Sequence, residues 1–355
     1  MNQVATVGVD LAKAVIVICA ADRVGRVLFF KQFSFNAFAQ WAATIPSCTF
    51  GMEACSSAHH WGRQLAAHGH TVRLIAAEFV KPFRKSQGAK NDRNDAQAIL
   101  TAVRQPDMRF VSVKSVDQQS VLSWHCMRRG WSDDRTALIN RVRGLLAEFG
   151  VWLPQSPGVL KRALPRMLEN EILPLRMRAL LIVAQEELRR LDELIERCEM
   201  EIRAHAQQNE DAQRIQSIIG VGPITASAVA VTVSNVRDFK NGRQMAAWLG
   251  LVPQQFSSGG KVSLGKITKR GDTYLRGLLT GGARSALLSA MRKPPAQRTR
   301  LQSWMVEAHL RIGYYRTMVA IANKHARMIW AILAKGGAYD SEAWKQYAPR
   351  VAVVA

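Results

Sequence analysis

The sequence lacks the features that would place it in a membrane or cross-link it with disulfides. None of its apolar runs approaches the ~18 residues that a membrane-spanning helix needs, and no N-terminal signal pattern is present. Five cysteines are scattered without a CxxC pair, which argues against both a disulfide framework and a zinc ribbon. We therefore expect a soluble intracellular protein.

Acidic residues are also scarce. The 355 residues include 27 Asp and Glu against 49 Lys and Arg, a formal charge of +22. Because 48% of the chain is apolar, it can bury real cores, and the charge does not mark a disordered basic tail. Lys and Arg gain affinity by releasing counterions from phosphates, so the composition favours a nucleic-acid partner over a membrane surface.

The first third of the chain alternates strands and helices. Three β-branched runs, at residues 4–9, 14–19 and 27–33, follow one another too closely for helices between them and predict an antiparallel meander. A dinucleotide-binding fold would need a helix after its first strand, so this order argues against one. Further strands are expected at residues 48–52 and 71–75, and helices at residues 36–43, 59–68 and 94–103.

Four carboxylates stand out against this background. Asp10 and Glu53 each end a predicted strand, while Asp92 and Asp95 lie three residues apart on one face of a predicted helix. If they meet at one sheet edge they can hold Mg²⁺, which prefers oxygen ligands and can assist phosphodiester displacement. The alternative is that the helix pair only charges a helix N-terminus and the other two are ordinary strand-end acids. The basic setting favours the metal site, since it suits a polyanion; its cations are Lys81, Arg84, Lys85, Lys90 and Arg93.

The middle of the chain predicts two long amphipathic helices joined by a proline-rich segment. The first helix, about residues 117–149, has apolar residues at three-four spacing, interrupted by Arg128 and Arg135. They are Val121, Trp124, Trp131, Leu138, Val142, Leu145 and Phe149. The second repeats apolar residues every seven positions from Leu181 to Ile202, with an intermediate set of Ala184, Leu191 and Cys198. We predict a coiled coil and favour pairing between chains over a hairpin within one chain.

The last third contains two glycine-rich turns. Gly220-Val221-Gly222 opens a helix of small residues, either as a phosphate-binding turn or as a tight turn between packed helices. Further on, Ser257-Ser258-Gly259-Gly260 is predicted to form a polar loop flanked by cations. From composition alone, this loop is interpreted as an ordinary solvated turn. The cations expected to contact nucleic acid there are Lys261, Lys266, Lys269, Arg270 and Arg276.

Three acidic segments carry a resemblance to a known family. Residues 8–13 (GVDLAK), 51–54 (GMEA) and 90–96 (KNDRNDA) resemble the DEDD transposases of the insertion-sequence "one-ten" family, particularly its "eleven-eleven" branch. The resemblance spans nearly the whole chain. It implies an α/β RNase H-like domain of the RuvC type at residues 1–115, whose metal-binding quartet is Asp10, Glu53, Asp92 and Asp95.

The resemblance extends to the rest of the chain. It implies a coiled-coil linker or dimerisation region at residues 116–210 and a mainly helical transposase domain at residues 211–340, followed by a tail at residues 341–355. The serine-glycine loop then holds the nucleophile, Ser257 or Ser258, which attacks DNA and forms a phosphoserine link. The cofactor implied is Mg²⁺, or Mn²⁺ in vitro. The partners implied are element and target DNA, a structured guide RNA and further copies of the chain as a dimer or tetramer.

The function expected is therefore that of a transposase which excises and inserts DNA by strand exchange. Such a protein would be cytoplasmic and associated with the nucleoid. One alternative is a metal-dependent Holliday-junction endonuclease that uses the acids and water alone. The other is a noncatalytic nucleic-acid-binding scaffold in which the acids only cap helices.

Overall fold

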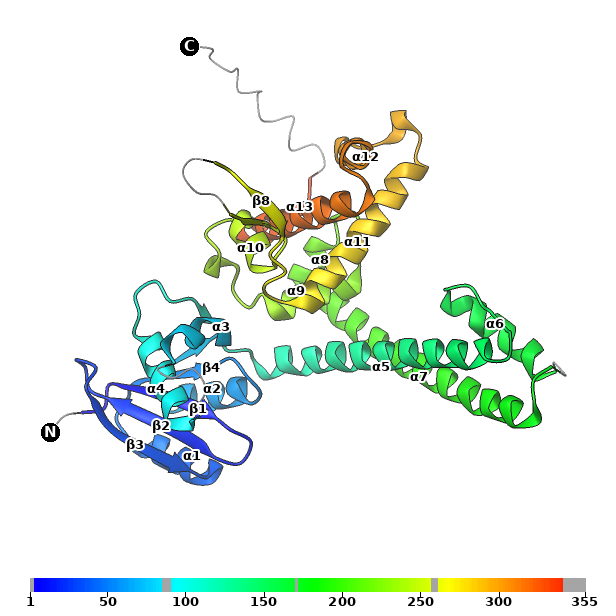
Figure 1. The fold of residues 1–355 in the computed structure, drawn as a ribbon. Coiled ribbons are helices and arrows are strands. Elements are labelled where there is room, and N and C mark those ends of the chain that lie inside the picture. The colour runs from blue at the N-terminus through cyan, green and yellow to red at the C-terminus, as the bar shows by residue number, and fades with distance from the viewer. Residues whose placement is uncertain (1–2, 85–90, 170–171, 257–260, 341–355) are drawn as a thin grey trace, which may run out of the picture. The chain divides into compact units, whose positions relative to one another are not determined.

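The computed structural model describes residues 3–84, 91–169, 172–256 and 261–340 of the chain (Figure 1). It divides into two compact units, Met1–Gln119 and Ser120–Ala355. The first unit is a mixed α/β domain, and the second is mainly helical. In the part of the chain that is described, no helix is both long enough and apolar enough to cross a membrane.

The first unit is built on a six-stranded sheet with the strand order β3-β2-β1-β4-β5-β6. The strands β1 (Thr6–Leu11), β2 (Ile16–Ala21) and β3 (Val27–Phe33) pair antiparallel, which confirms the predicted meander. Strand β1 also pairs in parallel with β4 (Thr49–Glu53), and β4 with β5 (Thr71–Ile75). A short antiparallel strand that the sequence did not predict, β6 (Phe110–Val111), closes the far edge.

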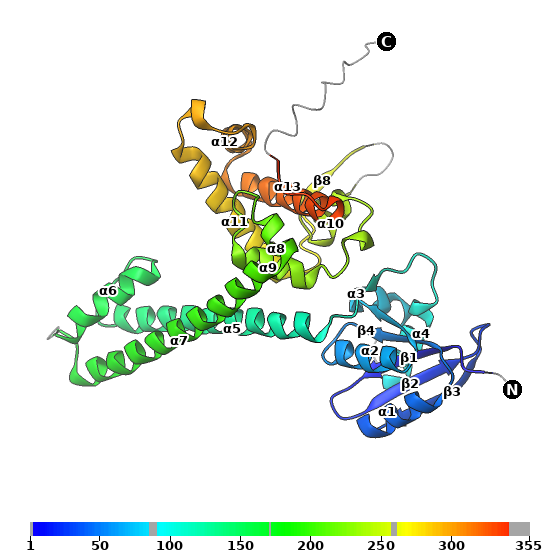
Figure 2. The same ribbon diagram turned by 180° about the vertical axis from the view of Figure 1, so that it is seen from behind.

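Helices cover both faces of this sheet (Figures 1 and 2). Helices α1 (Phe35–Thr44) and α2 (Ala58–Ala67) pack on one face, over a core that includes Val9 and Met52. Helix α4 (Asp92–Val103) packs on the other face. It begins at Asn91, whose side chain accepts a hydrogen bond from the backbone N–H of Arg93 at 3.0 Å, as expected of an N-cap residue.

A short connection leads from β5 toward α4. It consists of α3 (Ala77–Val80) and a 3₁₀ turn, η1 (Lys81–Phe83). Phe79 and Phe83 pack against the buried face of α4, in a cluster that includes Ile99 and Val103. This packing fixes the position of the next residue, Arg84.

The second unit begins with a helical hairpin. Its two long helices are α5 (Val116–Ala147) and α7 (Leu175–Gln208), and the short helix α6 (Pro157–Leu168) lies at the far end of the hairpin (Figures 1 and 2). Every position of the predicted heptad seam on α7 is buried: Leu181, Ala184, Leu188, Leu191, Ile195, Cys198 and Ile202. The N-terminal part of the seam, from Leu181 to Leu188, packs with residues of α5 and α6 of the same chain. The described helices therefore use this seam within one chain, and pairing between chains stays a prediction.

The buried face of α5 differs from the predicted one by about one residue. His125, Ile139, Val142 and Leu146 are buried, whereas Leu145 and Phe149 are exposed. The difference arises because Arg128 and Arg135 lie on the seam and not beside it. Their guanidinium groups form ion pairs with Glu199 and Asp192 of α7, at 2.6 and 2.9 Å.

The remaining helices of the second unit pack around one apolar core (Figure 2). They are α8 (Glu210–Ile215), α9 (Pro223–Thr232), α10 (Gly242–Trp248), α11 (Thr273–Arg292), α12 (Arg300–Ile312) and α13 (Tyr314–Lys335), with 3₁₀ turns η2 (Val236–Asp238) and η3 (Pro295–Gln297). An exposed hairpin, β7 (Pro253–Gln255) and β8 (Leu264–Ile267), projects from this core.

Gly220 explains the first glycine-rich turn of this unit. Its φ of +90° suits glycine, and a Cβ there would lie 2.5 Å from the carbonyl oxygen of Gly282 on α11. The turn therefore packs closely on a helix, which favours the interpretation as a tight turn between helices.

Candidate active site

Strand register places Asp10 and Glu53 at neighbouring positions. The parallel pairing of β1 with β4 sets Val9 opposite Met52, and the two acids follow these residues directly. Val9 and Met52 belong to the core under α1 and α2. Because side chains alternate along a strand, Asp10 and Glu53 lie on the opposite face, which α4 covers.

Two glycines let α4 lie directly on this face. A Cβ on Gly8 would come within 2.3 Å of the carbonyl oxygen of Ala96, and one on Gly51 within 2.9 Å of Val103 Cβ. Any larger residue would lift the helix from the strands. Asp92 lies one turn before Ala96, so it belongs to the same face of α4, at the end near Asp10.

Asp95 is the most enclosed of these acids, with 8% of its surface exposed. Its carboxylate accepts from Arg84, whose Nε lies 3.0 Å from Asp95 Oδ1. The same guanidinium reaches Glu53, with an Nη2–Oε1 distance of 3.3 Å. One cation therefore bridges two of the four predicted metal ligands, one from the sheet and one from the helix.

The pKa of the Cys55 thiol is affected by two acids of the site, Glu53 and Asp10. Burial is the main cause that raises its pKa, and the negative charges of Glu53 and Asp10 raise it further. The two carboxylates of the neighbouring strand ends thus act on one common point. A high pKa keeps this thiol protonated and a weak metal ligand, so the oxygens of the acids are the better donors here.

The donors suit a hard divalent cation, since the quartet is carboxylate oxygen only. The arrangement stops short of a complete coordination shell. Within residues 3–84, 91–169, 172–256 and 261–340, no group of three or more His, Cys, Asp or Glu side chains is close enough to hold a metal ion. The structure therefore joins Glu53 and Asp95 through Arg84, and the strand register sets Asp10 beside Glu53.

The predicted nucleophiles, Ser257 and Ser258, lie outside the described residues, as does Lys90. The hairpin on either side of the serines is described: Gln255 pairs with Leu264, and Phe256 N–H donates to the carbonyl of Ser263 at 2.9 Å. Phe256 is 66% exposed. Most residues of the two strands are also exposed. The serine loop thus joins two paired and solvent-exposed strands.

The predicted phosphate-contacting cations fall into two groups. Four are exposed: Lys261, Lys266, Lys269 and Arg270. Arg276 is half-buried, and its Nη1 donates to the carbonyls of Leu249 and Arg270 at 3.1 and 2.9 Å. It therefore holds the backbone next to the hairpin. In the first unit, Arg93 is exposed, with its guanidinium carbon 5.5 Å from the centre of the Phe30 ring.

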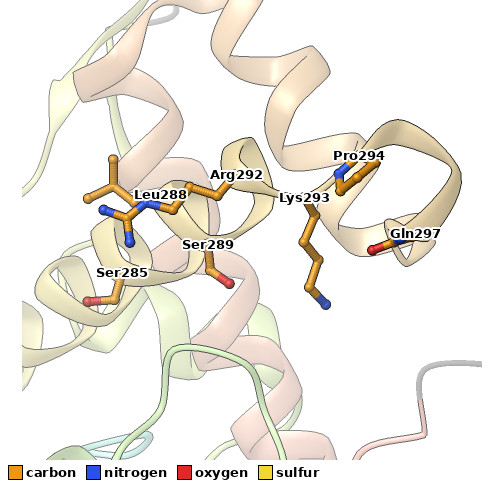
Figure 3. Close-up of a pocket in the computed structure, with 7 residues that line it drawn as sticks. All are labelled: Ser285, Leu288, Ser289, Arg292, Lys293, Pro294 and Gln297. Atoms are coloured by element: carbon orange, nitrogen blue, oxygen red, sulfur yellow. The ribbon is translucent and has the colours of Figure 1, made fainter.

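In the sequence, Arg84 is only one of several basic residues around the acids. A pattern of residue types could not reveal its two ion pairs, because they depend on how α3 and η1 carry the chain back over the sheet. Two open hollows in the second unit were also missed. One, of about 520 Å³, lies where α11 ends, and Figure 3 shows Ser285, Ser289 and Arg292 on successive turns of that helix, followed by Lys293 and Gln297.

Comparison with known proteins defines the class of this protein as a transposase. A family model described as "Transposase", the DEDD transposase domain of IS110 elements, matches residues 7–150. A second, described as "Transposase IS116/IS110/IS902 family", matches residues 212–302.

Curated relatives match almost end to end. A "Probable family 20 transposase" of Pseudomonas aeruginosa is 43% identical, over 94% of this chain and 98% of the relative. The transposase of insertion sequence IS1111A from Coxiella burnetii is 40% identical, over 96% and 92%. That of IS1328 from Yersinia enterocolitica is 36% identical, over 96% and 100%.

The chain belongs to the IS110/IS116/IS902 family of insertion-sequence transposases. This confirms the family resemblance and its "eleven-eleven" branch. The protein is thus an enzyme that cleaves and rejoins DNA, and its DEDD domain points to a divalent metal.

Proposed function

We propose that the first unit is an RNase H-like domain of the RuvC type, whose Asp10, Glu53, Asp92 and Asp95 bind Mg²⁺ at the scissile phosphate. The observation that supports this proposal is the position of Arg84, which bridges Glu53 of the sheet and Asp95 of α4, while α4 packs directly on Gly8 of β1. A divalent cation bound there would stabilise negative charge on the phosphate. Mn²⁺ would substitute for it in vitro.

The acids themselves have two tasks. They supply oxygen ligands from three separate elements, and the close contact of α4 with β1 limits how far these ligands can move apart. Arg93 in the first turn of α4, and Lys90 close before it in the sequence, would attract the DNA backbone toward these acids. The charge of the carboxylates alone would repel DNA, so these cations and the metal are both required.

The serine loop supplies the second half of the proposed chemistry. The Oγ of Ser257 or Ser258 attacks the phosphorus, and one deoxyribose oxygen leaves and takes up a proton. The phosphodiester bond is replaced by a phosphoserine ester, so its energy is kept for rejoining. A free DNA hydroxyl then attacks this ester, joins to the phosphorus and releases the serine.

The partners follow from this scheme. Exchange of strands between element and target needs more than one active subunit, so we propose a dimer or tetramer. The exposed cations Lys261, Lys266, Lys269 and Arg270 next to the serine hairpin would neutralise backbone phosphates. We further propose that a structured RNA pairs with donor and target DNA and supplies most of the sequence specificity.

The acidic site is tested by Asp95→Asn, with Asp134→Asn as the matched control because Asp134 is an exposed acid on α5. Strand exchange on DNA carrying the element ends should fall by at least about 100-fold in the first variant, as expected when a charge stabiliser of the transition state is lost. DNA binding by gel shift should stay within about twofold for both. Full activity of Asp95→Asn would refute the proposed site.

A further inference from the structure

A second hollow of the helical unit lies between the start of α10 and the middle of α13. It is open to solvent and has a volume of about 470 Å³. Three cations line it: Arg243 from α10, and Lys324 and Arg327 from α13. We call it the cationic hollow.

The walls of the cationic hollow are fixed by close packing. A Cβ on Gly242 would lie 2.9 Å from the Cα of Arg327, so the backbones of α10 and α13 are in direct contact. Beside them, Trp330 Nε1 donates to the carbonyl of Phe239 at 3.0 Å. The ammonium of Lys324 lies 4.5 Å from the centre of the Trp304 ring, which restricts the direction of this side chain. The cations are therefore held by a rigid frame.

These positive charges are not neutralised by neighbours. Among the residues that the structure describes, none of the three forms an ion pair within 4.0 Å, although ten such pairs are found elsewhere in the second unit. The pKa of Lys324 is lowered, first by burial and then by repulsion from Arg327 and Arg300. Like charges held together without an acid are costly for the free protein, and a bound anion would remove that cost.

We propose that the cationic hollow binds the phosphodiester backbone of a nucleic acid during transposition. Its charged lining residues are all cations, which bind phosphate groups and do not by themselves read base edges. The site therefore contributes affinity and orientation, not sequence specificity. The proposal rests on the membership of the chain in a DNA-acting family. It does not depend on the proposed roles of the acids and the serine loop.

The test compares Lys324→Gln with Lys335→Gln in the full chain. Lys335 is an exposed lysine at the end of the same helix, so the two variants lose the same charge. Fluorescence anisotropy with a DNA duplex and with an RNA duplex would be measured over a range of salt. Loss of one phosphate contact should weaken binding about fivefold at 0.15 M salt and reduce the salt slope by about 0.9 in Lys324→Gln alone. An effect on only one of the two duplexes would assign the site to that nucleic acid.

Thermal unfolding gives a second readout that a purely structural role would not give. Removing one of several repelling charges should leave the melting temperature of Lys324→Gln unchanged or higher while binding falls. The exposed Arg243→Gln variant should weaken binding in the same way without risk to the core. Affinities equal to that of Lys335→Gln in both variants would overturn the proposal. A second contrary result would be a wild-type melting temperature that rises with inorganic phosphate while both variants bind both duplexes as tightly as the wild type does. That result would show a site for free phosphate and not for nucleic acid.

Discussion

Arg84 lies between two carboxylates that the proposed mechanism assigns to metal binding. Its guanidinium contacts Glu53 and Asp95 and so holds the sheet acid and the helix acid in one place. A cation in this position lowers the repulsion between the acids in the metal-free protein. The same position is the one from which a divalent ion would reach both carboxylates, so we expect Arg84 and the metal to compete.

Replacing Arg84 by Gln should therefore tighten Mn²⁺ or Mg²⁺ binding. We expect about fivefold, at the low end of typical coupling between two sites, because the Arg84 side chain is 41% exposed and partly screened. Isothermal titration of the full chain measures this affinity directly. Arg23→Gln is the matched control, since this exposed arginine lies in the turn between β2 and β3, at the other end of α4. An unchanged or weaker affinity in Arg84→Gln would show that the arginine does not compete.

The elements that hold the four acids were predictable from sequence, whereas their role as metal ligands stays a prediction. Asp10 and Glu53 lie at the ends of β1 and β4, and Asp92 and Asp95 lie in the first turn of α4. Arg84 was not predictable in this way. Its role depends on a tertiary turn through α3 and η1, which leaves no periodic signal in the sequence.

At the level of elements, the meander in the first unit was predicted from β-branched runs and the short connections between them. Connections of only a few residues leave no other way to join β1, β2 and β3. The face of α5 was predicted less well. In the sequence, Arg128 and Arg135 interrupt an apolar stripe, so they were not predicted to lie on the buried face. Their partner acids belong to α7, about 60 to 70 residues away in the sequence.

The seam arginines should therefore matter more than surface arginines for stability. The Arg128 and Glu199 side chains are only 23% and 17% exposed, so Arg128→Met would leave a half-buried carboxylate with one partner fewer. We expect a loss of about 2 kcal/mol in the free energy of unfolding, below the range for fully buried pairs. Arg189→Met serves as comparison, because its pair with Glu193 is exposed and worth about 0.5 kcal/mol or less. Urea unfolding measures both, and equal losses would contradict a role for Arg128 in the seam.

Buried histidines connect packing to pH across the whole chain. Burial is the main cause that lowers the pKa of His59, His125 and His325 to about 4. His125 still finds partners, with Tyr274 Oη at 2.9 Å and Ser227 Oγ at 3.0 Å. Among the described residues, neither ring nitrogen of the fully buried His325 has a hydrogen-bond partner.

Stability should therefore fall as the pH drops from about 6.5 toward 4. In that window the unfolded chain binds protons at these rings and the folded chain does not, so protonation favours unfolding. The loss for a buried ring such as His325 approaches about 3 kcal/mol below pH 4. His325→Leu should flatten this dependence and leave stability at pH 7 equal or higher, because it removes unpaired buried nitrogens. Thermal melts at several pH values would check this, and an unchanged pH slope in the variant would count against it.

The strongest sequence signal at the scale of the whole chain is its charge of +22, which indicated a nucleic-acid partner before any motif was considered. Charge alone could not locate the contacts. The cationic hollow joins residues about 80 positions apart, and it forms only when α10 packs on α13. The serine loop shows the opposite case, since its role rests on a motif and not on described geometry.

The central claim is that a serine of this loop captures DNA covalently under the control of the acidic site. The most direct measurement is a reaction of the full chain with element-end DNA and Mg²⁺, quenched in denaturant and separated on a denaturing gel. The account predicts DNA that migrates with the protein, and loss of this species in Asp95→Asn and in either Ser257→Ala or Ser258→Ala. Cleaved DNA with free ends and no attached protein, formed equally by both serine variants, would contradict it.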